Sequence, residues 1–143
     1  MMDTISAKER SNIMSRVKSK NTRPEMFIRR MLHRAGFRYR LHDTTLPGKP
    51  DIVFPRKRKI IFVNGCFWHR HEGCKQAKIP KSNQVFWHAK LEGNKMRDKC
   101  NLRELHNAGW ETMIVWECEL KDVQTLEKKL LEFLSGETTL QPQ

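Results

Sequence analysis

Hydrophobic positions recur at helical intervals in four stretches of the chain. Residues 6–20 mix such positions with many basic side chains behind a capping-box pair, which predicts a helix that lies outside the core. A second capping box, formed by Thr22 and Glu25, opens a helix that Gly36 is placed to end. The apolar face of this core helix consists of Phe27, Ile28, Met31 and Leu32.

Two further helices are expected in the second half of the chain. Residues 82–108 have a mainly helical pattern, although Gly93 and Asn94 predict a break or kink within it. Residues 122–135 carry leucines along one side, as an amphipathic helix does. The tail that follows, 137–143, is expected to be disordered.

Short apolar runs bounded by turn-forming residues predict four strands. A loop rich in Pro and Gly leads to Asp51 at the start of one strand, and a basic turn, 55–59, joins that strand to the next as a hairpin. The order helix, helix, strand, strand, strand, helix, strand, helix is typical of a mixed α/β domain. The strands are expected at residues 37–41, 52–54, 60–63 and 110–116.

Length and charge narrow the class of protein. A chain of 143 residues is expected to form a single domain, 1–143, and it lacks a membrane-spanning run and a signal-peptide pattern, so a cytoplasmic protein is expected. Its 28 basic and 16 acidic residues give a net charge of +12, which suits a polyanion. Nucleic acid is favoured over acidic lipid because the charge is spread along the chain. The predicted helix 6–20 is then a candidate to grip DNA.

Candidate metal ligands are concentrated directly after the strand 60–63. The eleven residues that follow contain two cysteines, two histidines and two adjacent aromatic residues. Soft thiolates together with an imidazole are the donors that a tetrahedral zinc ion prefers, and Cys118 lies at the end of another apolar run. Cys100, expected on a helix, is not assigned to this site. The predicted zinc ligands are Cys66, His71, Cys74 and Cys118.

Asp51 suggests a second metal site, of a harder kind. It opens a strand, and the strand 60–63 is expected to pass beside it. A carboxylate next to a backbone carbonyl is an oxygen site suited to Mg²⁺, an ion that phosphodiester cleavage commonly uses. A lone aspartate at the edge of a strand is, on the other hand, also an ordinary turn residue.

Three segments together resemble the very-short-patch-repair (Vsr) endonuclease family. They are residues 46–51 (LPGKPD), 61–69 (IFVNGCFWH) and 115–118 (VWEC), and the resemblance covers about residues 6–136. It implies a restriction-endonuclease-like fold, with a central mixed β-sheet flanked by helices, a structural zinc and a catalytic Mg²⁺. The implied reaction is nicking of one strand of double-stranded DNA beside T:G mismatches left by deamination of 5-methylcytosine. A monomer is expected, with other mismatch-repair proteins as further partners.

The resemblance also assigns roles to individual residues. Asp51 becomes the metal-binding carboxylate, with the main-chain carbonyl of Val63 as the second protein ligand. Glu25 and His69 become the water-mediated and general acid/base partners, since a histidine pKa lies near the operating pH. For Glu25 the alternative is a purely structural role in its capping box. For His69 the alternative is a zinc ligand or an exposed loop residue.

Aromatic side chains in the Cys/His segment are candidates for contact with the mismatch. Phe67 and Trp68 lie between predicted zinc ligands, and apolar groups held rigidly there can wedge between base pairs. The resemblance adds Trp87 from a later helix and Met14 from the N-terminal helix. Packing in the core is the alternative for Trp87 and Met14.

The chain departs from the usual restriction-enzyme pattern at the strand after Asp51. Phe62, Val63 and Asn64 stand where an acidic residue and a lysine are common, and Asn64 replaces a histidine of some family members. Asparagine can bond a phosphate or a metal-bound water but cannot carry a proton at neutral pH, so proton transfer should depend on His69. Two other hypotheses stay open: a nuclease of the same fold with another DNA substrate, and a non-catalytic zinc-containing DNA-binding protein.

Overall fold

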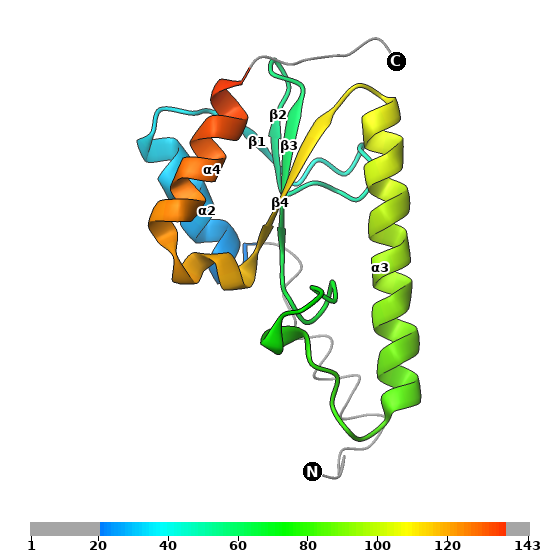
Figure 1. Cartoon of the computed structure of the whole chain (residues 1–143). Helices are drawn as coiled ribbons and strands as arrows, with labels where there is room; N and C mark the ends of the chain where they lie inside the picture. Colours follow the sequence, from blue (N-terminus) through cyan, green and yellow to red (C-terminus); the bar gives the residue numbers. More distant parts are fainter. Residues whose placement is uncertain (1–20, 137–143) are drawn as a thin grey trace.

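The computed structural model of the protein describes residues 21–136 (Figure 1). The predicted helix 6–20 with Met14 and the predicted disordered tail 137–143 lie outside the described residues. No helix in the described part is long and apolar enough to cross a membrane. The helices and strands are α2 (Arg23–Arg34), β1 (Arg40–Leu41), β2 (Ile52–Phe54), β3 (Lys59–Asn64), α3 (Gln84–Asn107), β4 (Glu111–Trp116) and α4 (Val123–Ser135), with 3-10 turns η1 (Lys75–Ala77) and η2 (Glu117–Lys121).

The four strands form one mixed sheet in the order β1-β2-β3-β4. β1 with β2 and β2 with β3 are antiparallel, whereas β3 and β4 are parallel and pair from Lys59 with Glu111 to Asn64 with Trp116. Because a parallel pair needs a long crossover connection, the chain between β3 and β4 includes all of α3. The predicted mixed α/β architecture and the predicted hairpin are confirmed.

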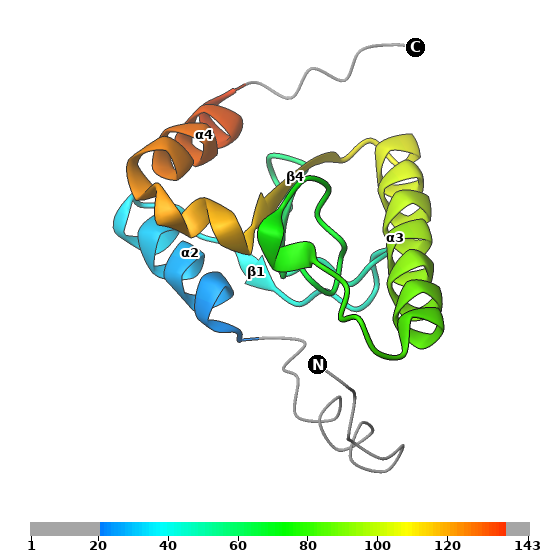
Figure 2. The ribbon, with the colours of Figure 1, turned by 60° about the horizontal axis from the view of Figure 1, so that its bottom comes forward.

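Helices cover both faces of this sheet: α2 and α4 lie on one side and α3 on the other (Figures 1 and 2). Neighbouring residues of β3 therefore enter different cores, as the alternation of side chains along a strand requires. Ile61 packs with residues of α2 and α4, while Ile60 packs with Leu105 of α3. The strands are apolar on both faces because both faces are covered.

Two predicted elements differ in extent from the structure. The expected strand 37–41 is a strand only at Arg40–Leu41. The break expected at Gly93 and Asn94 is wrong, because α3 continues through both residues. Asn94 donates its amide to the carbonyl of Trp68, at 2.9 Å. Its polar side chain thus serves a tertiary contact and leaves the helical backbone intact.

Lys59 was expected in the basic turn 55–59, and this is wrong. It begins β3 and is buried, and its ammonium group donates to the carbonyls of Phe133 and Gly136 at 2.5 Å. These carbonyls lie at the C-terminal end of α4, which carries the negative end of the helix dipole. Lys59 therefore fastens α4 to the sheet by satisfying carbonyl groups that have no partner within the helix.

Candidate active site

A cavity of about 910 Å³ lies between the start of α2, the loop before β2, the end of β3 and one side of α3. The segment that follows β3 lies at this end of the sheet and leads into α3 (Figure 2). Both polar and aromatic side chains reach the cavity. Those relevant to the predicted site are Asp51, Asn64, Phe67, Trp68 and His69, together with His42, Lys49, Asp98 and Glu117.

Asp51 stands at the entrance to β2, next to the neighbouring strand β3. Its Oδ2 accepts a hydrogen bond from the main-chain N–H of Val63, at 2.8 Å. Burial raises the pKa of Asp51 to about 6; the Val63 bond opposes this shift, and the Glu25 carboxylate adds to it. A carboxylate that is costly to ionise in the free protein is well suited to bind a cation, because the cation would stabilise the negative charge that water no longer solvates.

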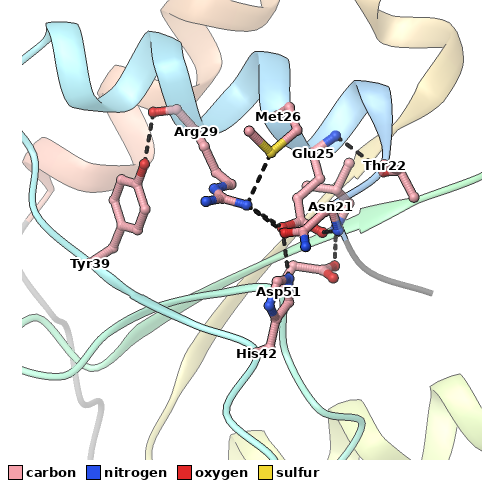
Figure 3. Close-up of polar contacts among 9 residues, drawn as sticks. Asn21, Thr22, Glu25, Met26, Arg29, Tyr39, His42 and Asp51 are labelled. Atoms are coloured by element: carbon pink, nitrogen blue, oxygen red, sulfur yellow. Dashed lines mark hydrogen bonds and ion pairs between the residues drawn. The ribbon is translucent and has the colours of Figure 1, made fainter. Parts of the chain in front are cut away.

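Glu25 points from α2 toward Asp51 and is almost fully buried (Figure 3). Thr22 accepts the N–H of Glu25 at 3.3 Å, which is one half of the predicted capping box. The other half is absent, because the Glu25 carboxylate accepts the N–H of Asn21 instead of that of Thr22. The second carboxylate oxygen meets Arg29 at 3.3 Å. Glu25 therefore keeps part of its capping role, while its carboxylate lies beside Asp51.

His42 belongs to the same group, although the sequence gave no sign of it. Its Nε2 lies 2.7 Å from Oε2 of Glu25. Donor atoms of Glu25, His42 and Asp51 all lie within 4.8 Å of one another, a spacing that can hold a metal ion. No motif marks His42, because it is brought to the site by the pairing of β1 with β2 and not by its neighbours in sequence.

His69 faces the same cavity from the segment after β3. Its Nδ1 lies 2.6 Å from Oδ2 of Asp98 on α3. A carboxylate on one ring nitrogen fixes the orientation of the imidazole and leaves the other nitrogen available for proton transfer. Asp98 was not predicted, since a single acidic residue on a polar helix has no distinguishing pattern.

Cys66, His71, Cys74 and Cys118 form a second group, with all four donor atoms within 4.8 Å of one another. Cys118 donates its N–H to the sulfur of Cys66 at 3.4 Å, and its own sulfur lies 3.5 Å from His71 Nδ1. Burial raises the pKa of Cys66 to about 12, so in the free protein it stays a thiol at neutral pH. Three sulfurs and one nitrogen are a donor set that fits a soft tetrahedral metal ion. His69 lies outside this group.

The aromatic residues singled out in the sequence touch one another. Trp87 of α3 meets Phe67 and Trp68 edge to face, with ring centroids 5.4 and 6.0 Å apart. All three are half-buried, and none belongs to the two hydrophobic cores of the described residues. In this aromatic cluster of Phe67, Trp68 and Trp87, the first two line the cavity as an aromatic rim, and Trp87 packs against both.

A buried and a half-buried carboxylate beside histidines at the end of a mixed sheet are an arrangement that can hold a catalytic metal ion. Comparison with known proteins gives a narrower result. The family described as DNA mismatch endonuclease Vsr matches residues 2–76. The chain is 34% identical to the DNA mismatch endonuclease Vsr of Escherichia coli over 142 residues, which cover 96% of this chain and 90% of that protein. This chain belongs to the Vsr family.

Two nicking enzymes show higher identity. The type II nicking enzyme V.XorIIP of Xanthomonas oryzae pv. oryzae is 47% identical over 134 residues, which cover 94% of this chain and 98% of that protein. The type II nicking enzyme V.NmeAIP of Neisseria meningitidis is 42% identical over 130 residues, covering 91% and 92% of the two chains. The aligned stretches therefore span the positions of both candidate metal groups.

The raised pKa of Asp51 predicts a specific dependence of stability on pH. Between the ordinary value of 3.8 and about 6, the folded protein binds more protons than the unfolded chain, so this residue lowers stability as pH rises. Asp51→Asn removes the cost and keeps the acceptor for Val63. In Mg²⁺-free buffer, the stability gained by the variant should grow by about 2 kcal/mol between pH 4.5 and 7.5, measured by urea unfolding.

Asp122→Asn is the matched control. Hydrogen bonds from Thr125 lower the pKa of Asp122, so the control should not be stabilised at high pH. A gain for Asp51→Asn that is the same at both pH values would show that Asp51 titrates near its ordinary pKa.

Proposed function

We propose that the protein is a DNA mismatch endonuclease that nicks one strand beside a T:G mismatch arising from deamination of 5-methylcytosine, and so initiates very-short-patch repair. The observation that carries this proposal is the shared cavity of Asp51, His69 and the aromatic rim in a chain of the Vsr family. Carboxylate, imidazole and aromatic groups there lie within one cavity. Two helical layers around a mixed sheet are consistent with a restriction-endonuclease-like fold.

Asp51 and the main-chain carbonyl of Val63 would hold the catalytic Mg²⁺, with Glu25 acting through a water molecule. When bound, this ion polarises the scissile phosphate and supplies hydroxide at neutral pH. The Val63 N–H already fixes one oxygen of Asp51, so the carboxylate is oriented before the ion binds. The protein thereby avoids reorganising the site during the reaction.

His69 would transfer the proton. Asp98 holds Nδ1, so that Nε2 can give a proton to the leaving oxygen or take one from the attacking water. Asn64, buried at the end of β3, can donate a hydrogen bond to the phosphate but cannot titrate. His69 is therefore the proton carrier that we assign to the reaction.

DNA would be bound through the positive charge of the protein, and the mismatch would be recognised by the aromatic cluster. The net charge of +12 supplies binding to phosphates, which is independent of sequence and weakens steeply with salt. The aromatic cluster would insert where the stack is weak, because unstacking costs least at a mismatched pair. Its edge-to-face packing gives the rings mutual support while they remain partly exposed.

Asp51→Asn tests the catalytic assignment. The variant keeps the side chain's size but weakens metal binding, so nicking should fall by several orders of magnitude while DNA binding persists. The measurement is single-turnover nicking of a T:G duplex with Mg²⁺, beside matched T:A and C:G duplexes, and binding of the same duplexes with Ca²⁺. Asp43→Asn, at a half-exposed carboxylate of the loop before β2, is the control that should retain activity.

The three duplexes also separate the possible functions. Nicking of T:G alone supports the proposal. Cutting of all three duplexes would indicate a less selective nuclease, and binding without cutting would indicate a DNA-binding protein. An Asp51→Asn variant that binds and nicks within about tenfold of the parent rate would remove Asp51 from the mechanism.

We also propose that the Cys/His group holds a structural zinc. Four protein donors leave no open position for substrate, and the ion would join two distant parts of the chain. Metal analysis should find about one zinc per chain, and Cys118→Ser should lower both zinc content and stability. Cys100→Ser, at an exposed position on α3, should change neither. A metal-free Cys118→Ser protein of parental stability would contradict the assignment.

Replacing both Phe67 and Trp68 with alanine tests the aromatic wedge. Most electrostatic binding should survive, because phosphate contacts do not require these rings, whereas the preference for the T:G duplex over matched DNA should fall. Fluorescence anisotropy with both duplexes measures this ratio. An equal loss of affinity for both would show that the rings serve packing alone.

A further inference from the structure

His42 is bonded to both carboxylate-bearing segments of the candidate metal site. Its imidazole Nε2 lies 2.7 Å from Glu25 Oε2, and its main-chain N–H donates to the carbonyl of Asp51 at 3.0 Å. In Figure 3 the ring of His42 and the carboxylates of Glu25 and Asp51 lie together in the space between α2 and the strands. One residue thus links the helix that carries Glu25 to the strand that begins after Asp51.

The backbone of His42 has an unusual conformation for this contact. Its φ of 48° lies in the left-handed region, which costs energy for a residue with a side chain. Glycine would adopt this turn freely, yet the position directly after β1 holds a histidine. Strained residues of this kind persist where the surroundings stabilise them, and they concentrate at functional sites. Here both stabilising contacts go to the Glu25/Asp51 group.

The spacing of the donor atoms fits coordination by one ion. The 2.7 Å contact between His42 Nε2 and Glu25 is a hydrogen bond in the free protein, so a bound ion would take the place of this bond, with Glu25 still acting through a water molecule. Asp51 lies in the same group of donor atoms, all within 4.8 Å of one another. Arg29, which meets the same Glu25 oxygen, supplies positive charge that keeps this carboxylate in place before an ion binds.

We propose that His42 is a direct nitrogen ligand of the catalytic cation, and that the site consequently binds a first-row transition-metal ion such as Mn²⁺ more tightly than Mg²⁺. This rests on the proposed function only in taking the Asp51 group as the catalytic site. Magnesium prefers oxygen donors, whereas later divalent ions accept imidazole more readily. With a nitrogen ligand, the ratio of Mn²⁺ to Mg²⁺ affinity depends on residue 42.

The experiment compares the zinc-loaded full chain with His42→Gln, which can still donate a hydrogen bond to Glu25. Calorimetric titration with Mn²⁺ and with Mg²⁺ should show a loss of Mn²⁺ affinity of about tenfold or more in the variant, and a smaller loss for Mg²⁺. His33→Gln, on the exposed side of α2, should leave both affinities unchanged.

Pulsed electron paramagnetic resonance of the Mn²⁺ complex gives a second readout that does not depend on activity. The parent should show coupling to a directly bound imidazole nitrogen. His42→Gln should abolish it, and His69→Gln should retain it. If His42→Gln does not fold, His42→Asn and the parent spectrum decide the question, because a parent without nitrogen coupling overturns the proposal.

These outcomes are separable from those of the proposed function. Nicking of T:G by a parent protein whose Mn²⁺ complex shows no nitrogen coupling would overturn the role of His42 alone. Nitrogen coupling that survives in His42→Gln would do the same. Coupling assigned to His42 in a parent that does not nick T:G would support the ligand role and reject the proposed function.

Discussion

The parallel pairing of β3 with β4 is the constraint on which the two metal groups depend. In its register Asn64 faces Trp116, and a cysteine follows two residues after each of them. Cys66 and Cys118, far apart in the sequence, are therefore placed side by side at the same end of the sheet. The antiparallel partner of β3, strand β2, brings Asp51 to this end as well, where it meets the N–H of Val63.

The segment after β3 is held from two sides. The Cys/His group fixes its base, and α3 holds its outer part through Arg70 with Glu92, Lys95 with Glu72, and Asn94 with the carbonyl of Trp68. Between these attachments lie the aromatic residues and His69. Side chains that must meet a distorted duplex in one orientation gain from such support, because less ordering is left to the moment of binding.

Features that depend on local pattern could be predicted from the sequence. The core helix, the hairpin and the grouping of the four Cys/His residues were expected from periodicity, turn residues and spacing. His42, Asp98 and the buried Lys59 could not be predicted, because each acquires its role from a partner on another element. The predicted break in α3 failed for the same reason: Asn94 is a tertiary donor, which the sequence alone does not distinguish from a helix breaker.

The crossover between β3 and β4 has a consequence for the order of folding. Contacts between distant residues form slowly, because a long loop must close before any of them can form. The hairpin can form early, but Cys118 cannot meet Cys66 until residues 65–110, with α3, have been accommodated. Until then Cys66 and Cys74, on one segment, are separated from Cys118. The Cys/His group can thus be completed only late in folding, after the crossover between β3 and β4 has formed.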